Sequence, residues 1–241
     1  MSPDVKQRIQ LALAVAIAIA AARTGYIFYE RRVTANLEKQ EQQRHALDAD
    51  YYVTPKKLYP YDLKSAQQLT QQPVWVKEGY RYTYYPYDPA RHHVDFDHDA
   101  GLLLPIERLE IQDVVSAPTP KTPHERQVMA VFQKEEKSYA VPVGMETGGD
   151  YKIYSDEMFY IQDPHELYKH WPADVWDAIA KHQIKPGMNE LQADFAVGMG
   201  TPDPSGDPSV KTVHYPNGGK PVSVTYRDGK AAEIEPKPPA S

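Results

Sequence analysis

The chain has 241 residues, contains no cysteine and carries a formal net charge of −6 at neutral pH. Without cysteine it can form no disulfide, thiolate nucleophile, zinc ribbon or iron–sulfur site. The acidic balance argues against nucleic acid as a partner, because proteins that bind nucleic acid expose basic faces to the phosphates. The 22 prolines and 18 tyrosines favour many short strands and turns, since proline interrupts helices and aromatic residues suit pleated surfaces.

An apolar segment lies near the N-terminus. It runs from Ile9 to Ala22, and apolar side chains resume at Tyr26–Tyr29. Residues 9–29 are long enough, at about 1.5 Å per residue, to cross the hydrocarbon core of a lipid bilayer as one helix. The segment therefore predicts a membrane anchor within residues 1–32, and a cleaved secretory signal is the alternative.

Changes in composition divide the rest of the chain into five further segments. A polar stretch that fits a helical stalk precedes a β region rich in tyrosine and proline. A small SH3-like barrel with helices, an α/β module and a disordered tail follow. In chain order these segments are residues 33–49, 50–123, 124–183, 184–235 and 236–241.

The β region is predicted from alternating side chains. Residues 75–84 alternate so that Tyr80, Tyr82 and Tyr84 share one face of a strand, and we expect this face to bind a protein partner. Four short apolar or alternating runs come next and favour a small antiparallel barrel. These runs are residues 127–133, 138–143, 150–154 and 158–162.

A pair of aromatic helices is expected after the barrel. Asp163 and Pro164 suit the N-cap and the first position of a helix, and the Trp171-Pro172 step predicts a break into two helices. Trp171 and Trp176 lie five residues apart in this region. Both tryptophans either pack in the core or bind a partner as hot-spot residues, and the sequence leaves both alternatives open.

The C-terminal module resembles a known family. Its motifs are Ile184-Lys-Pro-Gly-Met-Asn-Glu-Leu-Gln, Gly-Met-Gly-Thr-Pro from Gly198, and two alternating strands that end in Asp228-Gly-Lys. These motifs resemble BamE-type (SmpA/OmlA-like) outer-membrane lipoproteins over residues 184–235. The resemblance implies a small α/β module that faces the periplasm and contacts other proteins, although the family's lipidation cysteine is missing here.

The short helix of this module is expected between Gly187 and Gly200, where glycine can adopt the positive φ that a turn or C-cap requires. Met188, Leu191 and Phe195 follow helical spacing, so we predict that they bury one helix face against the strands. The strands themselves are expected at residues 210–215, 221–226 and 231–234.

A polar loop rich in histidine and aspartate spans residues 92–99. Asp95, Asp97 and Asp99 take the first, third and fifth positions of a calcium-loop spacing, but the required glycine and glutamate fall one place late. We therefore expect no calcium site, and a solvated acidic loop is the simplest interpretation. Another metal or ligand site remains open through the three histidines of the loop. These are His92, His93 and His98.

The chain contains no G-x-S-x-G, H-E-x-x-H, Walker A or G-x-G-x-x-G motif, so we expect neither catalysis nor a cofactor. The predicted fold class is α+β, with a single transmembrane helix, an SH3-like barrel, an aromatic helical pair and the BamE-like module. The predicted location is the bacterial inner membrane, with the soluble part in the periplasm. The predicted function is a scaffold or accessory subunit of a cell-envelope complex, which binds membrane or periplasmic proteins. The alternative is a periplasmic receptor that uses residues 92–99.

Overall fold

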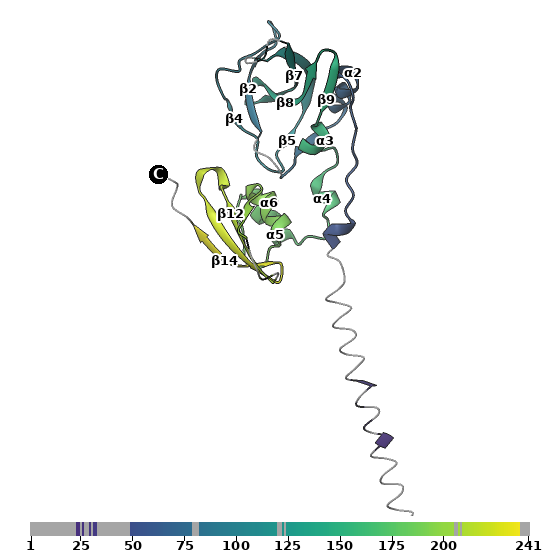
Figure 1. Ribbon diagram of the computed structural model, residues 1–241, viewed down its shortest axis with the longest axis vertical. Coiled ribbons are helices and arrows are strands. Elements are labelled where there is room, and N and C mark those ends of the chain that lie inside the picture. Colours follow the sequence, from purple (N-terminus) through teal and green to yellow (C-terminus); the bar gives the residue numbers. More distant parts are fainter. Residues whose placement is uncertain are drawn as a thin grey trace, which may run out of the picture. The chain divides into compact units, whose positions relative to one another are not determined.

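The computed structural model describes most of the chain from Ala49 to Pro236 and six residues before it (Figure 1). Contacts divide the chain into two units, residues 1–52 and 53–241. In the first unit, the described part ends in the 3-10 turn η1 (Ala49–Tyr52). The described residues are 23–24, 26, 29, 31–32, 49–78, 82–119, 122, 124–204, 207 and 209–236.

The expected transmembrane helix is not supported. No helix in the described part of the chain combines the length and the apolar character that a bilayer span requires. Most of the predicted span, residues 9–29, lies outside the described residues. The prediction of a single-pass inner-membrane protein is corrected accordingly.

The second unit consists mostly of β-strands, which form three sheets. Its described helices are few and short, and the longest have eight residues. The predicted α+β class is therefore wrong. Strand pairing, most extensively between strands that follow one another in the chain, supplies more of the described structure than helix packing does.

The largest sheet has seven strands and forms a half-barrel. Its order is β3-β2-β8-β7-β6, with β4 paired to β2 and β9 paired to β8. Because these strands come from residues 83–118 as well as 125–153, no separate SH3-like barrel forms within residues 124–183. The strands are β2 (Thr83–Asp88), β3 (His93–Val94), β4 (Gly101–Leu102), β6 (Ile111–Pro118), β7 (Glu125–Lys134), β8 (Lys137–Thr147) and β9 (Asp150–Ile153).

Both faces of this sheet are buried, as the side chains of β7 show. Val128, Ala130 and Phe132 belong to one core, whereas Met129 and Val131 belong to another. All five side chains are at most 4% exposed. Successive residues of a strand point to opposite faces, so a continuous apolar run is what a strand between two cores requires.

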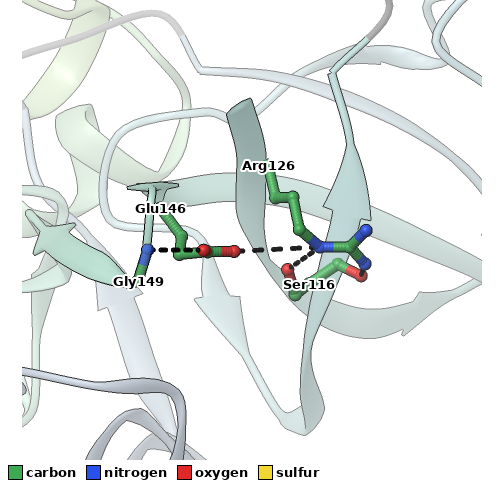
Figure 2. A network of polar contacts seen from close by, with 4 residues as sticks. All are labelled: Ser116, Arg126, Glu146 and Gly149. Carbon is green, nitrogen blue, oxygen red and sulfur yellow. Dashed lines mark hydrogen bonds and ion pairs between the residues drawn. The ribbon is translucent and has the colours of Figure 1, made fainter. Parts of the chain in front are cut away.

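Polar contacts join three neighbouring strands on a more exposed part of the sheet (Figure 2). The Arg126 guanidinium donates through Nε to the Ser116 hydroxyl (2.7 Å) and through Nη2 to the Ser116 carbonyl (2.8 Å). Its Nε also lies 3.9 Å from Glu146 Oε2, while Glu146 Oε1 accepts a 3.1 Å hydrogen bond from the Gly149 amide. These side chains link β6, β7, β8 and the turn before β9.

A smaller sheet, with the order β10-β1-β5, covers one of the two cores. Its strands are β1 (Val74–Val76), β5 (Arg108–Leu109) and β10 (Phe159–Tyr160). Val74, Val76 and Phe159 pack in the same core as Phe132. Three short helical segments, α2 (Leu63–Ala66), η2 (Gln67–Gln71) and α3 (Ser155–Met158), add further apolar side chains to this core.

The C-terminal part combines three short helices with a four-stranded sheet. The helices are α4 (Pro164–Leu167), α5 (Ala173–Ala180) and α6 (Glu190–Val197). The sheet consists of β11 (Thr201–Pro202), β12 (Val210–Tyr215), β13 (Val222–Arg227) and β14 (Lys230–Pro236), and the turn η3 (Asn217–Gly219) joins β12 to β13. The predicted strands of this region are confirmed. So is the helix start at Asp163, whose side chain accepts a hydrogen bond from the His165 amide.

Helix α6 is covered on two sides. Ala193, which is fully buried, packs in the sheet core with Val213 and Val224. Met188 and Phe195 belong instead to a core that the aromatic helices form, and Leu191 packs against that same core. The prediction that Met188, Leu191 and Phe195 face the sheet is therefore wrong, since Ala193 and Val197 are the residues of α6 that pack against the strands.

Two glycines at the end of α6 serve different purposes. Gly198 is the C-cap and has a φ of 84°, whereas Gly200 does not have a positive φ. A Cβ atom at Gly200 would lie 2.4 Å from Val213 Cγ1 and 2.9 Å from the Tyr215 ring. The expected positive φ is confirmed at Gly187 (87°) and is wrong at Gly200, where close approach of the sheet requires glycine.

We expect Gly200→Ala to lower the free energy of unfolding by about 1–3 kcal/mol, because the added methyl group overpacks the buried side chains of Val213 and Tyr215. Denaturant titration followed by circular dichroism measures the change. Met199→Ala, at the exposed neighbouring position, is the control and should alter stability by less than about 0.5 kcal/mol. Equal unfolding midpoints for Gly200→Ala and the wild type would contradict this close packing.

Candidate functional site

An aromatic core surrounds Phe195 of α6. The Phe195 ring is fully buried, and its centroid lies 5.0 Å from Trp171, 5.1 Å from Tyr168, 6.0 Å from Tyr160 and 6.3 Å from Trp176. Trp171 is only 6% exposed, so its ring packs in the core and offers little surface to a partner. Trp176, in contrast, is half-buried at the edge of the aromatic core.

Trp176 lines a pocket between α5 and the segment that precedes β5. The pocket encloses about 300 Å³ and is mostly apolar. The His165 ring stacks on the Trp176 indole at a centroid distance of 4.1 Å and an angle of 27°, which holds the indole in place. The lining residues are Leu104, Pro105, Ile106, Glu107, His165, Trp176, Ile179, Ala180 and His182.

Glu107 shapes the wall opposite α5. Its Oε2 accepts a 3.0 Å hydrogen bond from the Leu104 amide, and its Oε1 accepts one of 2.7 Å from Lys134 Nζ. Burial by itself would lower the pKa of Lys134, but the bond and charge of Glu107 outweigh this effect and raise it. Lys134 therefore neutralises Glu107, and the carboxylate braces the Leu104–Glu107 turn.

Both histidines of the pocket have one ring nitrogen engaged. His182 Nδ1 lies 3.0 Å from the Ala196 carbonyl, and His165 Nδ1 lies 2.9 Å from Asp163 Oδ1. A carbonyl only accepts hydrogen bonds, and so does an ionised carboxylate, so each Nδ1 carries the donated proton. The mostly apolar lining is suited to hold an apolar group, between imidazole rings that these bonds hold in place.

The structure separates the five residues predicted to bind a partner. Tyr84 is 8% exposed and packs in the core, Tyr82 is half-buried against the same core, and Tyr80 lies outside the described residues. Of the two tryptophans, Trp176 alone lines the pocket. The Leu104–Glu107 wall was not predicted, because pairing between β1 and β5, which are distant in the chain, places it beside α5.

The histidine–aspartate loop lines a separate cavity of about 210 Å³ beside Ala117–Thr119. His98 Nδ1 lies 2.9 Å from Asp95 Oδ2, and this bond lowers the pKa of Asp95 and raises that of His98. His92 Nδ1 lies 3.2 Å from the Tyr87 hydroxyl. In the described part of the chain, no group of three or more histidine, aspartate or glutamate side chains is arranged to hold a metal ion.

Among the carboxyl groups of the described residues, that of Asp194 in α6 has the pKa furthest from its ordinary value. Burial raises its pKa to about 7. The charges of Glu190 and Glu78 add to the rise, while hydrogen bonds from Tyr215 and the Gly200 amide oppose it. Its Oδ1 is buried and has no hydrogen-bond partner in the described structure. Asp194 does not line the Trp176 pocket, so we assign it a role in stability.

Comparison with known proteins identifies no relative, since no family model, curated protein or solved structure matches the chain. The resemblance of residues 184–235 to BamE-type lipoproteins therefore stays a prediction. The geometry of the Trp176 pocket is the observation on which a function can be based.

We expect Asp194→Asn to flatten the pH dependence of stability between about pH 4 and pH 7. The pKa of Asp194 is higher in the folded state than its usual value of 3.8, so the folded state retains a proton that the unfolded state has lost. Stability therefore falls as pH rises through this window, by at most about 1.4 kcal/mol per pH unit. Urea titrations of both proteins across the window measure the difference.

Asp174→Asn is the matched control for this measurement. The hydrogen bond and charge of Lys185 lower the pKa of Asp174, so its contribution is lost only as pH falls into the acid range. Its profile should match the wild type above about pH 5. If Asp194→Asn and the wild type show the same slope from pH 4 to pH 7, the proposed protonation of buried Asp194 is wrong.

Proposed function

We propose that this chain is a non-catalytic binding module, a scaffold or accessory subunit that holds an apolar side chain of a protein partner in the Trp176 pocket. The observation that carries the proposal is the half-buried Trp176 at a concave, mostly apolar site. Such pockets, with few polar groups, are typical of binding sites. Tryptophan is also enriched among the residues that dominate binding energy at interfaces.

The fixed shape of the pocket supports this proposal. On one side His165 stacks on Trp176, and on the other Glu107 holds the Leu104–Glu107 turn through its two oxygens. A pocket that is already ordered requires less conformational entropy to be lost on binding. None of the described residues that line it is a serine, threonine or lysine, and with no cysteine in the chain it offers no such nucleophile.

Two matched substitutions on α5 test the proposal. Ala180 lines the pocket and is exposed, so Ala180→Arg should fill the pocket without disturbing the core. Ala173→Arg makes the same change at an exposed position of α5 that does not line the pocket. A displayed library of random linear peptides is selected on the wild-type chain, and the enriched peptides are synthesised.

We expect the enriched peptides to share a large apolar residue. Calorimetric titration should show at least about a tenfold loss of affinity with Ala180→Arg, which corresponds to about 1.4 kcal/mol, and no loss with Ala173→Arg. Peptides that bind Ala180→Arg as tightly as the wild type would contradict the proposal.

A further inference from the structure

Strand β4 lies at an open edge of the half-barrel, next to the pocket. It pairs with β2 in the register Thr83↔Leu102 and Tyr84↔Gly101, and the Leu103 amide donates to the Tyr82 carbonyl at 2.9 Å. In an antiparallel pair, hydrogen-bonded residues alternate with residues that point their backbone groups outward. Because Leu103 is bonded to β2, the N–H and C=O of Leu102 point away from β2. In the described structure no other strand pairs with β4.

An apolar strip leads from this strand edge into the pocket. Leu102 and Leu104 are 42% and 43% exposed, whereas Leu103 between them is 3% exposed. Alternate residues of an extended segment lie on one face, so Leu102 and Leu104 form one apolar surface. Leu104 is also the first residue of the pocket wall.

The residues just before β4, at the end away from the pocket, are acidic. The side chains of Asp97 and Asp99 are exposed, and no ion pair engages either carboxylate in the described part of the chain. The strip from Asp99 to Leu104, with Asp97 in the turn just before it, thus has exposed carboxylates at one end, an unpaired backbone position at Leu102, and an apolar pocket at the other end. Each of the three features selects a different property of a ligand.

We infer that β4 binds an extended peptide segment of a partner by strand addition, with a basic residue at one end and a large apolar residue at the other. In the antiparallel arrangement, the apolar side chain enters the Trp176 pocket at the N-terminal end of the peptide. The peptide backbone exchanges two hydrogen bonds with Leu102, and a lysine or arginine meets Asp97 and Asp99. This inference rests on the proposed function of the pocket and adds the class of ligand that the pocket takes.

The spacing of these features sets the length of the peptide. Asp99 and Leu104 are five positions apart in the chain, which in an extended segment is about 17 Å. Six peptide residues therefore span the strip, with the third residue opposite Leu102. The probe is the capped hexapeptide acetyl-Phe-Thr-Val-Thr-Lys-Lys-amide, in which phenylalanine reaches the pocket, valine pairs with Leu102 and the C-terminal lysine lies opposite Asp99.

Calorimetric titration of this peptide into the wild-type chain tests the inference with two independent changes. Methylation of the valine nitrogen removes one of the two backbone hydrogen bonds and leaves the protein unchanged. Leu102→Pro removes the outward N–H of β4, which takes no part in the pairing with β2, and Leu102→Ala is the control that keeps this N–H. The N-methyl peptide should bind the wild-type chain at least about tenfold more weakly than the unmodified peptide does. Leu102→Pro should bind the unmodified peptide at least about tenfold more weakly than Leu102→Ala does.

The attraction between the peptide's lysines and the aspartates of the protein is tested by replacing both lysines with glutamate. The glutamate peptide should bind more weakly, and its affinity should rise with salt concentration where that of the lysine peptide falls. Equal affinity of the lysine and glutamate peptides would overturn the role of Asp97 and Asp99. No measurable binding of the lysine peptide at about 1 mM would overturn the inference as a whole.

Two further outcomes separate the inference from the proposed function. If the N-methyl peptide binds as tightly as its parent while Ala180→Arg abolishes binding, the pocket binds the side chain but strand addition is wrong. If Ala180→Arg binds the parent peptide as tightly as the wild type, the proposed function of the pocket fails as well.

Discussion

The buried ring of Phe195 is the contact on which the site depends. It touches Tyr160 from β10, Trp171 from the α4–α5 connection and Trp176 from α5, so one side chain joins a sheet to two helices. Aromatic pairs prefer particular orientations as well as distances, and a ring enclosed by several others therefore fixes the direction of each neighbouring element. Since α5 also supplies Ala180 to the pocket, the position of the pocket follows from packing inside the aromatic core.

The other side of α6 imposes the opposite requirement. Ala193 packs in the core of the C-terminal sheet, and Gly200, just after the helix, lies where Val213 and Tyr215 leave no space for a side chain. With Phe195 on one side and Ala193 on the other, an eight-residue helix separates two cores. A helix of this length is unstable alone in water, where roughly 12–15 residues are needed. Burial on two sides and the capping box between Asn189 and Gln192 supply the stability that its length does not.

Local patterns in the sequence located many strands, and long-range pairing decided the rest. The strands at residues 210–234 were predictable because alternation and the turn at Asp228-Gly229 are short-range signals. The mostly β class was not predictable in this way, because part of it depends on long-range pairing. Trp75 of β1, for example, pairs with Tyr160, which lies far along the chain. Alternation predicted that Tyr82 and Tyr84 share one face of a strand. It could not show that this face is covered by a hydrophobic core. Of the site, Trp176 was predictable, whereas the Leu104–Glu107 wall comes from the distant pairing of β1 with β5.

The polar groups of the pocket are mostly occupied by the protein itself. Both oxygens of Glu107 accept hydrogen bonds, and His165 and His182 each use Nδ1 within the fold. These bonds stiffen the walls and leave little charge with which to choose a ligand. Selectivity must then come from the shape of the pocket and from its surroundings. A two-residue strand such as β4 is a weak site for unspecific pairing, because few backbone groups are free. In the strand addition that we propose, a partner has to satisfy both this short edge and the pocket at once, which a random extended chain rarely does.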